Sequence, residues 1–415
     1  MSTYIVEGGR PLEGSVRVHG AKNSVLPILA ACLLAPGECV IHNCPELSDV
    51  RASLDILRRL GCRAERQGEA VVVDASAPTG WEVPDALMRE MRSSVIFLWA
   101  ILGRMGQAQM CAPGGCELGP RPIDLHLSAI RALGGAVEEA EGGLRCSGRL
   151  RGADIVLSLP SVGATENAML AAVSAHGDTT ITNAAREPEI VDLQNFLNTL
   201  GADVRGAGSS VITVRGGAPL HGGEYTVMGD RIVAATYLAA AASAGGEIQL
   251  TGVDWRHLST VTAVLREAGC AVESRAASIR LGCRSPLRGV PPVRTAPYPG
   301  FPTDAQAVLM AALAGGTGTT MFVENMFDSR YRHVDELSRM GADIQLAGRV
   351  AVVTGRPLHA AKVHSTDLRG GAALVVAALG AEGVSQVSGL EYIRRGYEDL
   401  EGQLTALGAQ VRLIH

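Results

Sequence analysis

Leu197-Asn-Thr-Leu-Gly-Ala-Asp-Val-Arg205 has the pattern of a helix that ends at a glycine and is followed at once by a strand. A glycine after an apolar residue is the usual left-handed cap of a helix, and alternating apolar residues after it indicate a strand. The pattern occurs six times, at intervals of 67 to 73 residues. Its marker glycines are Gly61, Gly134, Gly201, Gly269, Gly341 and Gly408. The chain therefore consists of six copies of one unit.

A second helix is predicted upstream of each cap, and it is apolar nearly all round. A helix without a polar face has to be buried. One unit then reads strand, buried helix, strand, surface helix, strand, strand, which predicts an α/β architecture with helices layered on sheets. The six buried helices are expected at residues 24–35, 93–103, 165–175, 231–244, 304–315 and 370–381.

The two ends of the chain complement each other. The sixth copy stops at Val411-Arg-Leu-Ile-His415, before its last strand, and residues 1–20 carry a segment of the missing kind. We therefore expect the two termini to share a domain, with three repeats in each domain. The predicted domains are residues 22–229, which include Cys116, and residues 1–21 with 230–415. A hinge is expected where the chain crosses between them, near residues 21 and 229.

Composition excludes several classes of function. The net charge of −5 argues against a nucleic-acid partner. The longest apolar runs, such as residues 372–379, are far shorter than the roughly 20 residues of a membrane span. The N-terminus lacks the basic start and apolar stretch of a signal peptide. Nine cysteines without C-x-x-C spacing indicate a reducing cytoplasm rather than a disulfide framework or a zinc site.

Polar residues gather where the buried helices begin. Helix N-termini attract anions, whereas a cation there opposes the helix dipole and needs a negative partner. A phosphorylated ligand would supply one, although Ser93 and Thr303 could equally be ordinary helix caps. Lysine is rare, since only Lys22 and Lys362 occur among the 37 basic residues. The polar starts are Lys22-Asn23, Arg92-Ser93, residues 163–165, Asp230-Arg231, Thr303-Asp304 and residues 367–369.

The stretch from Cys111 to His126 is rich in glycine and proline, so it forms neither a regular helix nor a regular strand. It contains Cys116 between a glycine and a glutamate, and Arg121 between two prolines. We interpret it as an active-site lid that carries a thiol and a phosphate-binding arginine. The chain has no P-loop, no G-x-G-x-x-G and no H-E-x-x-H motif. We therefore expect an anionic ligand bound without a metal or a cofactor.

Several segments together resemble the UDP-N-acetylglucosamine 1-carboxyvinyltransferase family along the whole chain. They are residues 20–23, 113–126, 161–165, 185–192, 301–304, 333–337, 366–369 and 395–397. The resemblance implies two inverse α/β barrels of three repeats each, the enolpyruvyl transferase fold. It implies transfer of the enolpyruvyl group of phosphoenolpyruvate to the 3-hydroxyl of UDP-N-acetylglucosamine, with release of phosphate, in the first committed step of peptidoglycan synthesis.

The resemblance further implies roles for individual residues. Cys116 would be the general acid and the site of alkylation by fosfomycin, and Asp304 would be the base. Phosphoenolpyruvate would be held by Lys22, Arg121 and Arg395, with Arg369 in support, while Asn23 would contact substrate and intermediate. The uridine nucleotide would be held by Arg92, Arg121, Pro122, Ile123, Asp124, Leu125, Ser161, Val162, Gly163, Asp304 and the backbone of Met326.

The sequence departs from the family pattern at four places. Leu159-Pro160 replaces a segment in which many members carry a lysine, and Val233, Ser329 and Arg394 also differ from the common residues. Two alternatives stay open. One is the sister enzyme that uses shikimate 3-phosphate as acceptor. The other is a non-catalytic paralogue that binds a nucleotide sugar.

Overall fold

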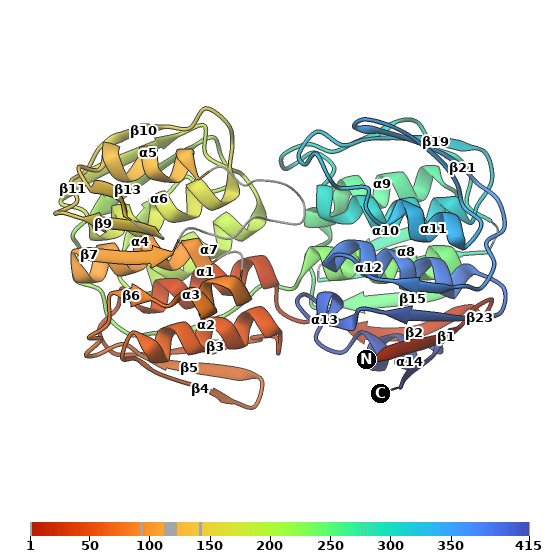
Figure 1. Cartoon of the computed structure of the whole chain (residues 1–415), viewed down its shortest axis with the longest axis horizontal. Helices are drawn as coiled ribbons and strands as arrows, with labels where there is room; N and C mark the ends of the chain where they lie inside the picture. The colour runs from red at the N-terminus through yellow and green to blue at the C-terminus, as the bar shows by residue number, and fades with distance from the viewer. Residues whose placement is uncertain are drawn as a thin grey trace. The chain divides into compact units, whose positions relative to one another are not determined.

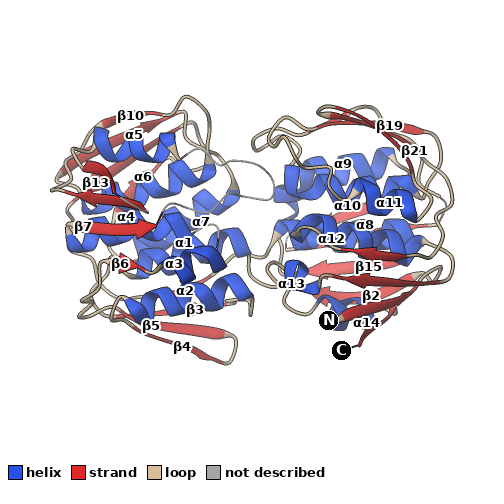
Figure 2. Cartoon of the chain, in the orientation of Figure 1, coloured by secondary structure: helices blue, strands red, loops and turns tan. Residues whose placement is uncertain are grey.

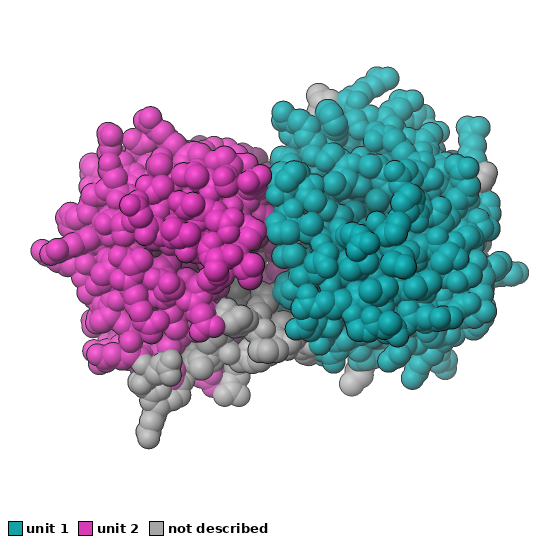
Figure 3. Space-filling model, turned by 90° about the horizontal axis from the view of Figure 1, so that it is seen from above, with its two compact units in different colours: residues 1–19, 117–119, 229–415 teal, residues 20–116, 120–228 magenta. Residues whose placement is uncertain are grey.

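The computed structural model describes residues 2–91, 94–111, 123–140, 143–275, 277–284 and 286–414. These residues form two compact units, which are coloured separately in Figure 3. Unit 1 contains the described residues up to His19 and from Gly229 onward, and unit 2 contains those from Gly20 to Met228. The chain thus passes between the units after His19 and after Met228.

Unit 1 has three buried helices, three sheets and several surface helices in its described part (Figure 1). The buried helices are α8 (Arg231–Ala244), α10 (Thr303–Ala314) and α12 (Leu368–Gly380). The sheets are β2 (Leu12–Arg17), β15 (Gly246–Thr251), β17 (Ser278–Cys283) and β16 (Ala271–Arg275); β18 (Val293–Arg294), β19 (Thr319–Val323), β21 (Val350–Thr354) and β20 (Asp343–Ala347); and β22 (Lys362–His364), β23 (Val384–Ser388), β1 (Thr3–Glu7) and β24 (Gln410–Ile414). The outer helices are η2 (Trp255–Leu258), α9 (Ser259–Glu267), α11 (Val334–Arg339), α13 (Leu390–Ile393) and α14 (Leu400–Ala406).

Unit 2 repeats this plan in its described part. Its buried helices are α1 (Lys22–Cys32), α4 (Val95–Met105) and α6 (Val162–Ser174). Its sheets are β14 (Glu224–Thr226), β3 (Glu38–His42), β5 (Ala70–Asp74) and β4 (Arg63–Gln67); β6 (Glu82–Val83), β7 (Gln107–Cys111), β9 (Gly143–Ser147) and β8 (Ala136–Ala140); and β10 (Asp154–Val156), β11 (Gly177–Thr182), β13 (Val211–Gly216) and β12 (Asp203–Arg205). The outer helices are α2 (Ser48–Arg59), α3 (Asp85–Glu90), α5 (Asp124–Ala132) and α7 (Pro188–Thr199).

The six sheets of the described chain share one strand order. Each has at one edge a strand that runs parallel to its neighbour, as β18 does beside β19. Each continues with two antiparallel pairings, as between β19, β21 and β20. In four of these sheets the parallel strand precedes the buried helix of the same repeat. The other two strands are exchanged, because β14, which precedes α8, pairs with β3, and β2, which precedes α1, pairs with β15. In unit 1, β1 lies between β23 and β24, so the first and last strands share a sheet.

The apolar helices lie inside and the sheets outside (Figure 2). In unit 1, α8, α10 and α12 pack against one another, and strands of the three sheets cover them. Of the 14 residues of α8, 12 are buried, which explains why its sequence has no polar face. The predicted fold, six βαβαββ-type repeats in two inverse α/β barrels of three repeats each, is confirmed.

Each surface helix that precedes a marker glycine ends in the same way. The six marker glycines all have φ between 82° and 110°. At Gly408 the amide donates to Thr405 O at 2.9 Å, and the next amide donates to Leu404 O at 3.0 Å. Equivalent pairs of hydrogen bonds close the other five helices. This is the Schellman motif, and glycine adopts its left-handed position at no steric cost.

The buried helices of unit 1 point in one direction. Their first residues lie close enough for Arg369 of α12 to reach Asp304 of α10. Their last turns, at Ala244, Gly315 and Gly380, line a cavity of about 610 Å³. Polar side chains therefore meet at one end of the three helices, and the carbonyl ends gather at the other.

We expect a substitution of Gly408 to lower the unfolding free energy only through the left-handed backbone conformation of this residue. A Cβ added there has no atom within 4 Å, so Gly408→Ala meets only the cost of a left-handed alanine, about 1–2 kcal/mol of unfolding free energy. Gly315→Ala is the matched control, because Gly315 ends α10 with φ −81° and a Cβ there makes ordinary contacts at 3.8 Å. Urea unfolding of both variants measures the difference. Equal stability of the two would contradict the prediction.

Candidate active site

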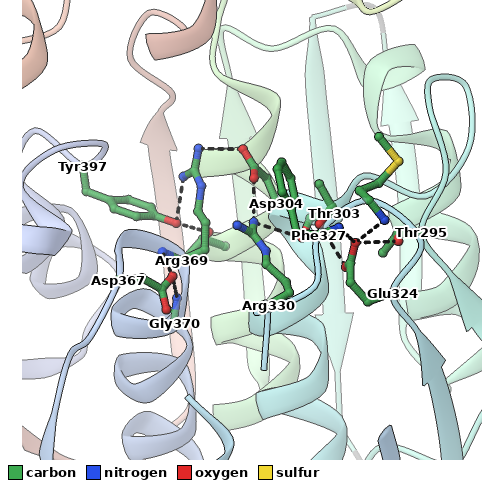
Figure 4. A network of polar contacts seen from close by, with 12 residues as sticks. Thr295, Thr303, Asp304, Glu324, Phe327, Arg330, Asp367, Arg369, Gly370 and Tyr397 are labelled. Atoms are coloured by element: carbon green, nitrogen blue, oxygen red, sulfur yellow. Dashed lines mark hydrogen bonds and ion pairs between the residues drawn. The ribbon is translucent and has the colours of Figure 1, made fainter. Parts of the chain in front are cut away.

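The first turn of α10 carries a carboxylate between two buried arginines (Figure 4). Arg330 Nη2 donates to Asp304 Oδ1 at 2.6 Å and to the carbonyl of Thr303 at 3.2 Å. Arg369 Nη2 approaches Asp304 Oδ2 at 3.5 Å. Both arginine side chains are 4% exposed or less, whereas that of Asp304 is 27% exposed. The carboxylate is therefore the part of this cluster that reaches solvent.

The two guanidinium groups decide the protonation of Asp304. Burial by itself would raise the pKa of this carboxyl, but the charges of Arg369 and then of Arg330 outweigh burial and hold the pKa well below its ordinary value of 3.8. Asp304 is consequently ionised at neutral pH. A carboxylate held in this way accepts hydrogen bonds readily and is a weak base until its ion pairs loosen.

Glu324 organises the segment beside this cluster. Glu324 is fully buried and directly follows β19. Oε1 accepts hydrogen bonds from Thr295 Oγ1 at 3.0 Å, from Met326 N at 2.8 Å and from Phe327 N at 3.1 Å, while Oε2 accepts one from Thr303 Oγ1 at 3.0 Å. One carboxylate thus joins the start of α10 to the loop at Met326 (Figure 4).

The starts of α8 and α12 are capped by aspartates. Asp230 Oδ1 accepts from the amides of Ile232 and Val233, and Asp367 Oδ1 accepts from those of Arg369 and Gly370, all between 2.8 and 3.1 Å. Thr303 is not a cap of this kind, since it is the first residue of α10 and its hydroxyl goes to Glu324. The three helix starts therefore bring three carboxylates together with Arg231, Arg330 and Arg369 in unit 1.

Unit 2 contains a buried ion pair at the corresponding place in its first repeat. Lys22 begins α1, and its Nζ lies 2.8 Å from Asp49 Oδ2 in the first turn of α2. Both side chains are nearly inaccessible, with exposures of 11% and 1%. A cation at a helix N-terminus was expected to need a ligand as its negative partner, yet Asp49 supplies that charge within the protein.

A second polar helix start in unit 2 belongs to α6. Ser161 caps α6 through a 3.3 Å hydrogen bond from Ala164 N. Thr165 Oγ1 donates to Ser161 O at 2.8 Å and accepts from Ala185 N at 3.0 Å. The turn at Ser161–Gly163 is thereby fixed to the segment that leads into α7.

Comparison with known proteins assigns this arrangement to a family. The family model for EPSP synthase (3-phosphoshikimate 1-carboxyvinyltransferase) matches residues 6–404. UDP-N-acetylglucosamine 1-carboxyvinyltransferase 2 of Caldanaerobacter subterraneus is 49% identical over 413 residues, which cover 99% of each chain. Isozyme 1 of Symbiobacterium thermophilum is 49% identical over 419 residues, with 99% of this chain and 95% of the relative covered. The chain belongs to the UDP-N-acetylglucosamine 1-carboxyvinyltransferase family.

Solved structures agree with this assignment. The enolpyruvyl transferase NikO from Streptomyces tendae matches with a TM-score of 0.89 at 27% identity, covering 99% of this chain and 98% of NikO. EPSP synthase from Acinetobacter baumannii matches with a TM-score of 0.77 over the full length of both chains, and at 20% identity it shows the shared fold alone. This chain is thus an enolpyruvyl transferase of the UDP-N-acetylglucosamine 1-carboxyvinyltransferase family.

The structure places most residues of the expected site at helix starts. In unit 1, Asp304 and Arg369 lie in the first turns of α10 and α12. Met326 lies in the loop after β19, and the half-buried Arg395 follows α13. In unit 2, Lys22 and Asn23 begin α1, Ser161, Val162 and Gly163 begin α6, and Ile123, Asp124 and Leu125 begin α5. Cys116, Arg92, Arg121 and Pro122 lie outside the described residues.

The family departures occupy different environments. Leu159 is 65% exposed, two residues before the cap of α6. Val233 is fully buried in the core of unit 1. Ser329 is partly buried beside Arg330, and Arg394 is exposed. None of the four contributes to the hydrogen bonds of Asp304.

Three residues that the sequence did not single out have defined contacts here: Asp49, Glu324 and Tyr397. Asp49 pairs with Lys22, Glu324 binds the loop of Met326, and Tyr397 accepts from Arg369 Nη1 at 3.2 Å. The partners of Asp49 and Tyr397 are 27 and 28 residues away, so no local pattern connects them. For Asp49 and Glu324 the available signal was position, since Asp49 lies in the first turn of α2 and Glu324 directly follows β19. Tyr397 lies between α13 and α14, where no such signal exists.

Within the described chain, no helix has the length and apolar character needed to cross a membrane. The described His, Cys, Asp and Glu side chains form no group of three or more that could hold a metal ion. The cysteines at positions 32, 39, 44, 62, 146, 270 and 283 are buried thiols. The polar chemistry of the described residues is therefore that of arginine, lysine, carboxylates and helix ends.

We expect the Asp304 ion pairs to stabilise the fold in a pH-dependent way. Because the folded pKa of Asp304 is depressed, their contribution is complete above the unfolded pKa of 3.8 and is lost as the pH falls through the folded pKa. At neutral pH, Asp304→Asn leaves two buried guanidinium groups without their carboxylate and lowers the unfolding free energy by about 3 kcal/mol.

The measurement is urea unfolding of wild type and Asp304→Asn at several pH values. The gap between them should be constant above about pH 5 and should narrow below about pH 4. Asp178→Asn is the control, because Asp178 and Arg215 form an exposed pair at 3.9 Å whose loss costs little. A gap that does not change with acidification would contradict the assigned ion pairs.

Proposed function

We infer that this chain transfers the enolpyruvyl group of phosphoenolpyruvate to the 3-hydroxyl of UDP-N-acetylglucosamine and releases phosphate. The observation that carries this inference is 49% identity, along essentially the whole chain, to relatives that bear the name of this activity. The product opens peptidoglycan synthesis, and through it cell-wall biogenesis, cell shape and cell division. We place the enzyme in the cytoplasm, with phosphoenolpyruvate and UDP-N-acetylglucosamine as its two partners.

The reaction is an addition followed by an elimination. In the addition, the sugar oxygen bonds to C2 of phosphoenolpyruvate, C3 gains a proton and the sugar hydroxyl loses one. In the elimination, C3 loses a proton and the bond from C2 to the phosphate oxygen breaks. The site therefore needs an acid for C3, a base for the hydroxyl and cations for the phosphate and the carboxylate.

We assign these roles to the residues of the expected site. Cys116 donates the proton to C3, and Asp304 receives the proton of the sugar hydroxyl. Lys22, Arg121 and Arg395 bind phosphoenolpyruvate, with Arg369 in support. Asn23 contacts substrate and intermediate, and the nucleotide is bound by Arg92, Arg121, Pro122, Ile123, Asp124, Leu125, Ser161, Val162, Gly163, Asp304 and the backbone of Met326.

The contacts described for Asp304 and Lys22 refine this assignment. Arg369 and Arg330 keep Asp304 ionised, so it is ready to accept a hydrogen bond from the sugar hydroxyl. Full proton transfer requires those ion pairs to loosen during the reaction. Lys22 is already paired with Asp49, so phosphate binding by Lys22 has to share or replace that partner. The passages of the chain between units, near residues 21 and 229, are our proposed hinge.

One specific observation favours a second candidate. The matching family model is named for EPSP synthase, whose acceptor is a shikimate phosphate. Phosphate release from phosphoenolpyruvate with each acceptor separates the two activities. Release with UDP-N-acetylglucosamine and none with shikimate 3-phosphate supports our inference, and the reverse result would refute it. No release with either acceptor would favour a non-catalytic paralogue.

We expect Cys116→Ser to reduce phosphate release at least about 100-fold near neutral pH, because a hydroxyl is a much weaker acid than a thiol and general acid catalysis contributes at least that factor. Cys111→Ser is the matched control from the same stretch, and it should retain activity. Peptide mass mapping after fosfomycin should show the added mass on Cys116. Alkylation of Cys111 instead, or full activity of Cys116→Ser, would remove Cys116 from the mechanism.

We expect Leu159→Lys to strengthen nucleotide binding, because it restores an ammonium group close to the Ser161–Gly163 turn. The KM for UDP-N-acetylglucosamine should fall about 2- to 5-fold at low salt, the size of one exposed charge contact, and the gain should shrink at high salt. Val156→Lys is the control, since Val156 is 73% exposed nearby in β10. An equal gain in both variants would indicate only a general effect of added positive charge.

A further inference from the structure

We propose that Tyr397 and Thr236 are positioning residues for Arg369. The inference rests on the proposed function, which gives Arg369 a supporting role in binding phosphoenolpyruvate. Tyr397 and Thr236 stand 161 residues apart in the chain and meet through their hydroxyl groups at 2.7 Å in unit 1. Both are buried, with exposures of 1% and 2%. Neither is among the residues that the family resemblance assigns to the site.

Tyr397 contacts Arg369 in two ways. Its hydroxyl accepts a hydrogen bond from Arg369 Nη1 at 3.2 Å, and its ring centroid lies 5.5 Å from the guanidinium carbon. The other arm, Nη2, points to Asp304 Oδ2 at 3.5 Å (Figure 4). Arg369 Nε has no hydrogen-bond partner among the described residues. The orientation of this guanidinium therefore depends on its two terminal nitrogens, and Tyr397 holds one of them.

Thr236 fixes the direction of the hydrogen bonds. A hydroxyl has one proton to donate, and Thr236 Oγ1 donates it to the carbonyl of Ile232 at 3.0 Å. The contact between Thr236 and Tyr397 must then use the tyrosine proton. With that proton directed to Thr236, the lone pairs of Tyr397 Oη remain for Arg369.

The result is a one-way chain from Arg369 through Tyr397 and Thr236 to Ile232 O. Arg369 lies in the first turn of α12, whereas Thr236 and Ile232 lie in α8. The ion pair with Asp304 adds the start of α10. The guanidinium is thus oriented from all three buried helices of unit 1 at once. Such a preorganised cation stabilises a developing negative charge without rearranging during the reaction.

Tyr397→Phe tests the hydroxyl alone, because the ring stays beneath the guanidinium. We expect the KM for phosphoenolpyruvate to rise about 10-fold, the factor that one hydrogen bond to a charged group carries. The KM for UDP-N-acetylglucosamine should change less than about 2-fold. Steady-state phosphate release at varied concentrations of each substrate measures both. An unchanged KM for phosphoenolpyruvate, or equal changes for the two substrates, would overturn the proposal.

Thr236 provides a second test and a rescue. Thr236→Val breaks the chain at its far end and should raise the KM for phosphoenolpyruvate in the same direction, whereas Thr236→Ser keeps the hydroxyl and should stay within about 2-fold of wild type. If Tyr397→Phe does not fold, the comparison of Thr236→Val with Thr236→Ser tests the positioning role instead. Thermal unfolding identifies a purely structural role, in which a variant melts earlier while its KM is unchanged, and that result overturns the proposal.

The outcomes distinguish this inference from the function on which it rests. If wild type releases no phosphate with UDP-N-acetylglucosamine, the proposed function fails and the positioning role fails with it. If wild type is active while Tyr397→Phe and Thr236→Val keep the wild-type KM for phosphoenolpyruvate, the positioning role alone fails.

Discussion

Helices without a polar face must be covered on every side, and the rest of this structure depends on that requirement. In the described chain, α8, α10 and α12 bury one another along one side and need sheets on the others. A four-stranded sheet covers only part of such a bundle, so three are needed. Three repeats contain all the strands of their own sheet. In the other three, β14 pairs with β3, β2 pairs with β15, and β1 completes the sheet of the last repeat, so each unit depends on strands that lie far apart in the sequence.

The same requirement confines polar chemistry to the helix ends. Along the buried helices a charged side chain would have to be desolvated, whereas at a first turn it can use free amides and neighbouring loops. Asp304 is ionised there because Arg330 and Arg369 compensate it, and Lys22 is tolerated because Asp49 lies 2.8 Å away. The site is therefore a set of mutually dependent charges. Removing one partner leaves another buried and unpaired, which costs more than the pair contributes.

The sequence predicted the repeat, the α/β class and the positions of the buried helices to within a few residues, because each of these depends on local periodicity. It also identified Asp304, Arg369 and Lys22 as polar residues at helix starts. It did not show that Asp304 pairs with Arg330, that Glu324 binds the loop of Met326, or that Tyr397 meets Thr236. The first two contacts lie within one repeat and depend on how the loop after β19 folds back onto the start of α10. The contact between Tyr397 and Thr236 joins two different repeats. The periodic pattern of one repeat contains no information about the side chains that another repeat brings to the same place.

The parallel arrangement of the helices in unit 1 explains why an acidic residue stands at each start. Three aligned dipoles place their positive ends together and repel one another there. Asp230 and Asp367 reduce this repulsion as caps, and Asp304 does so as an ion-paired carboxylate. The positive charges of Arg231, Arg330 and Arg369 in turn act on the carboxylate of Asp304. Under the proposed function, an anionic substrate would meet Arg330 and Arg369 already oriented by Asp304, so these cations would not have to be reoriented when it binds. The ion pairs that compensate the buried charges of the bundle are thus the same contacts that the proposed function uses to orient its cations.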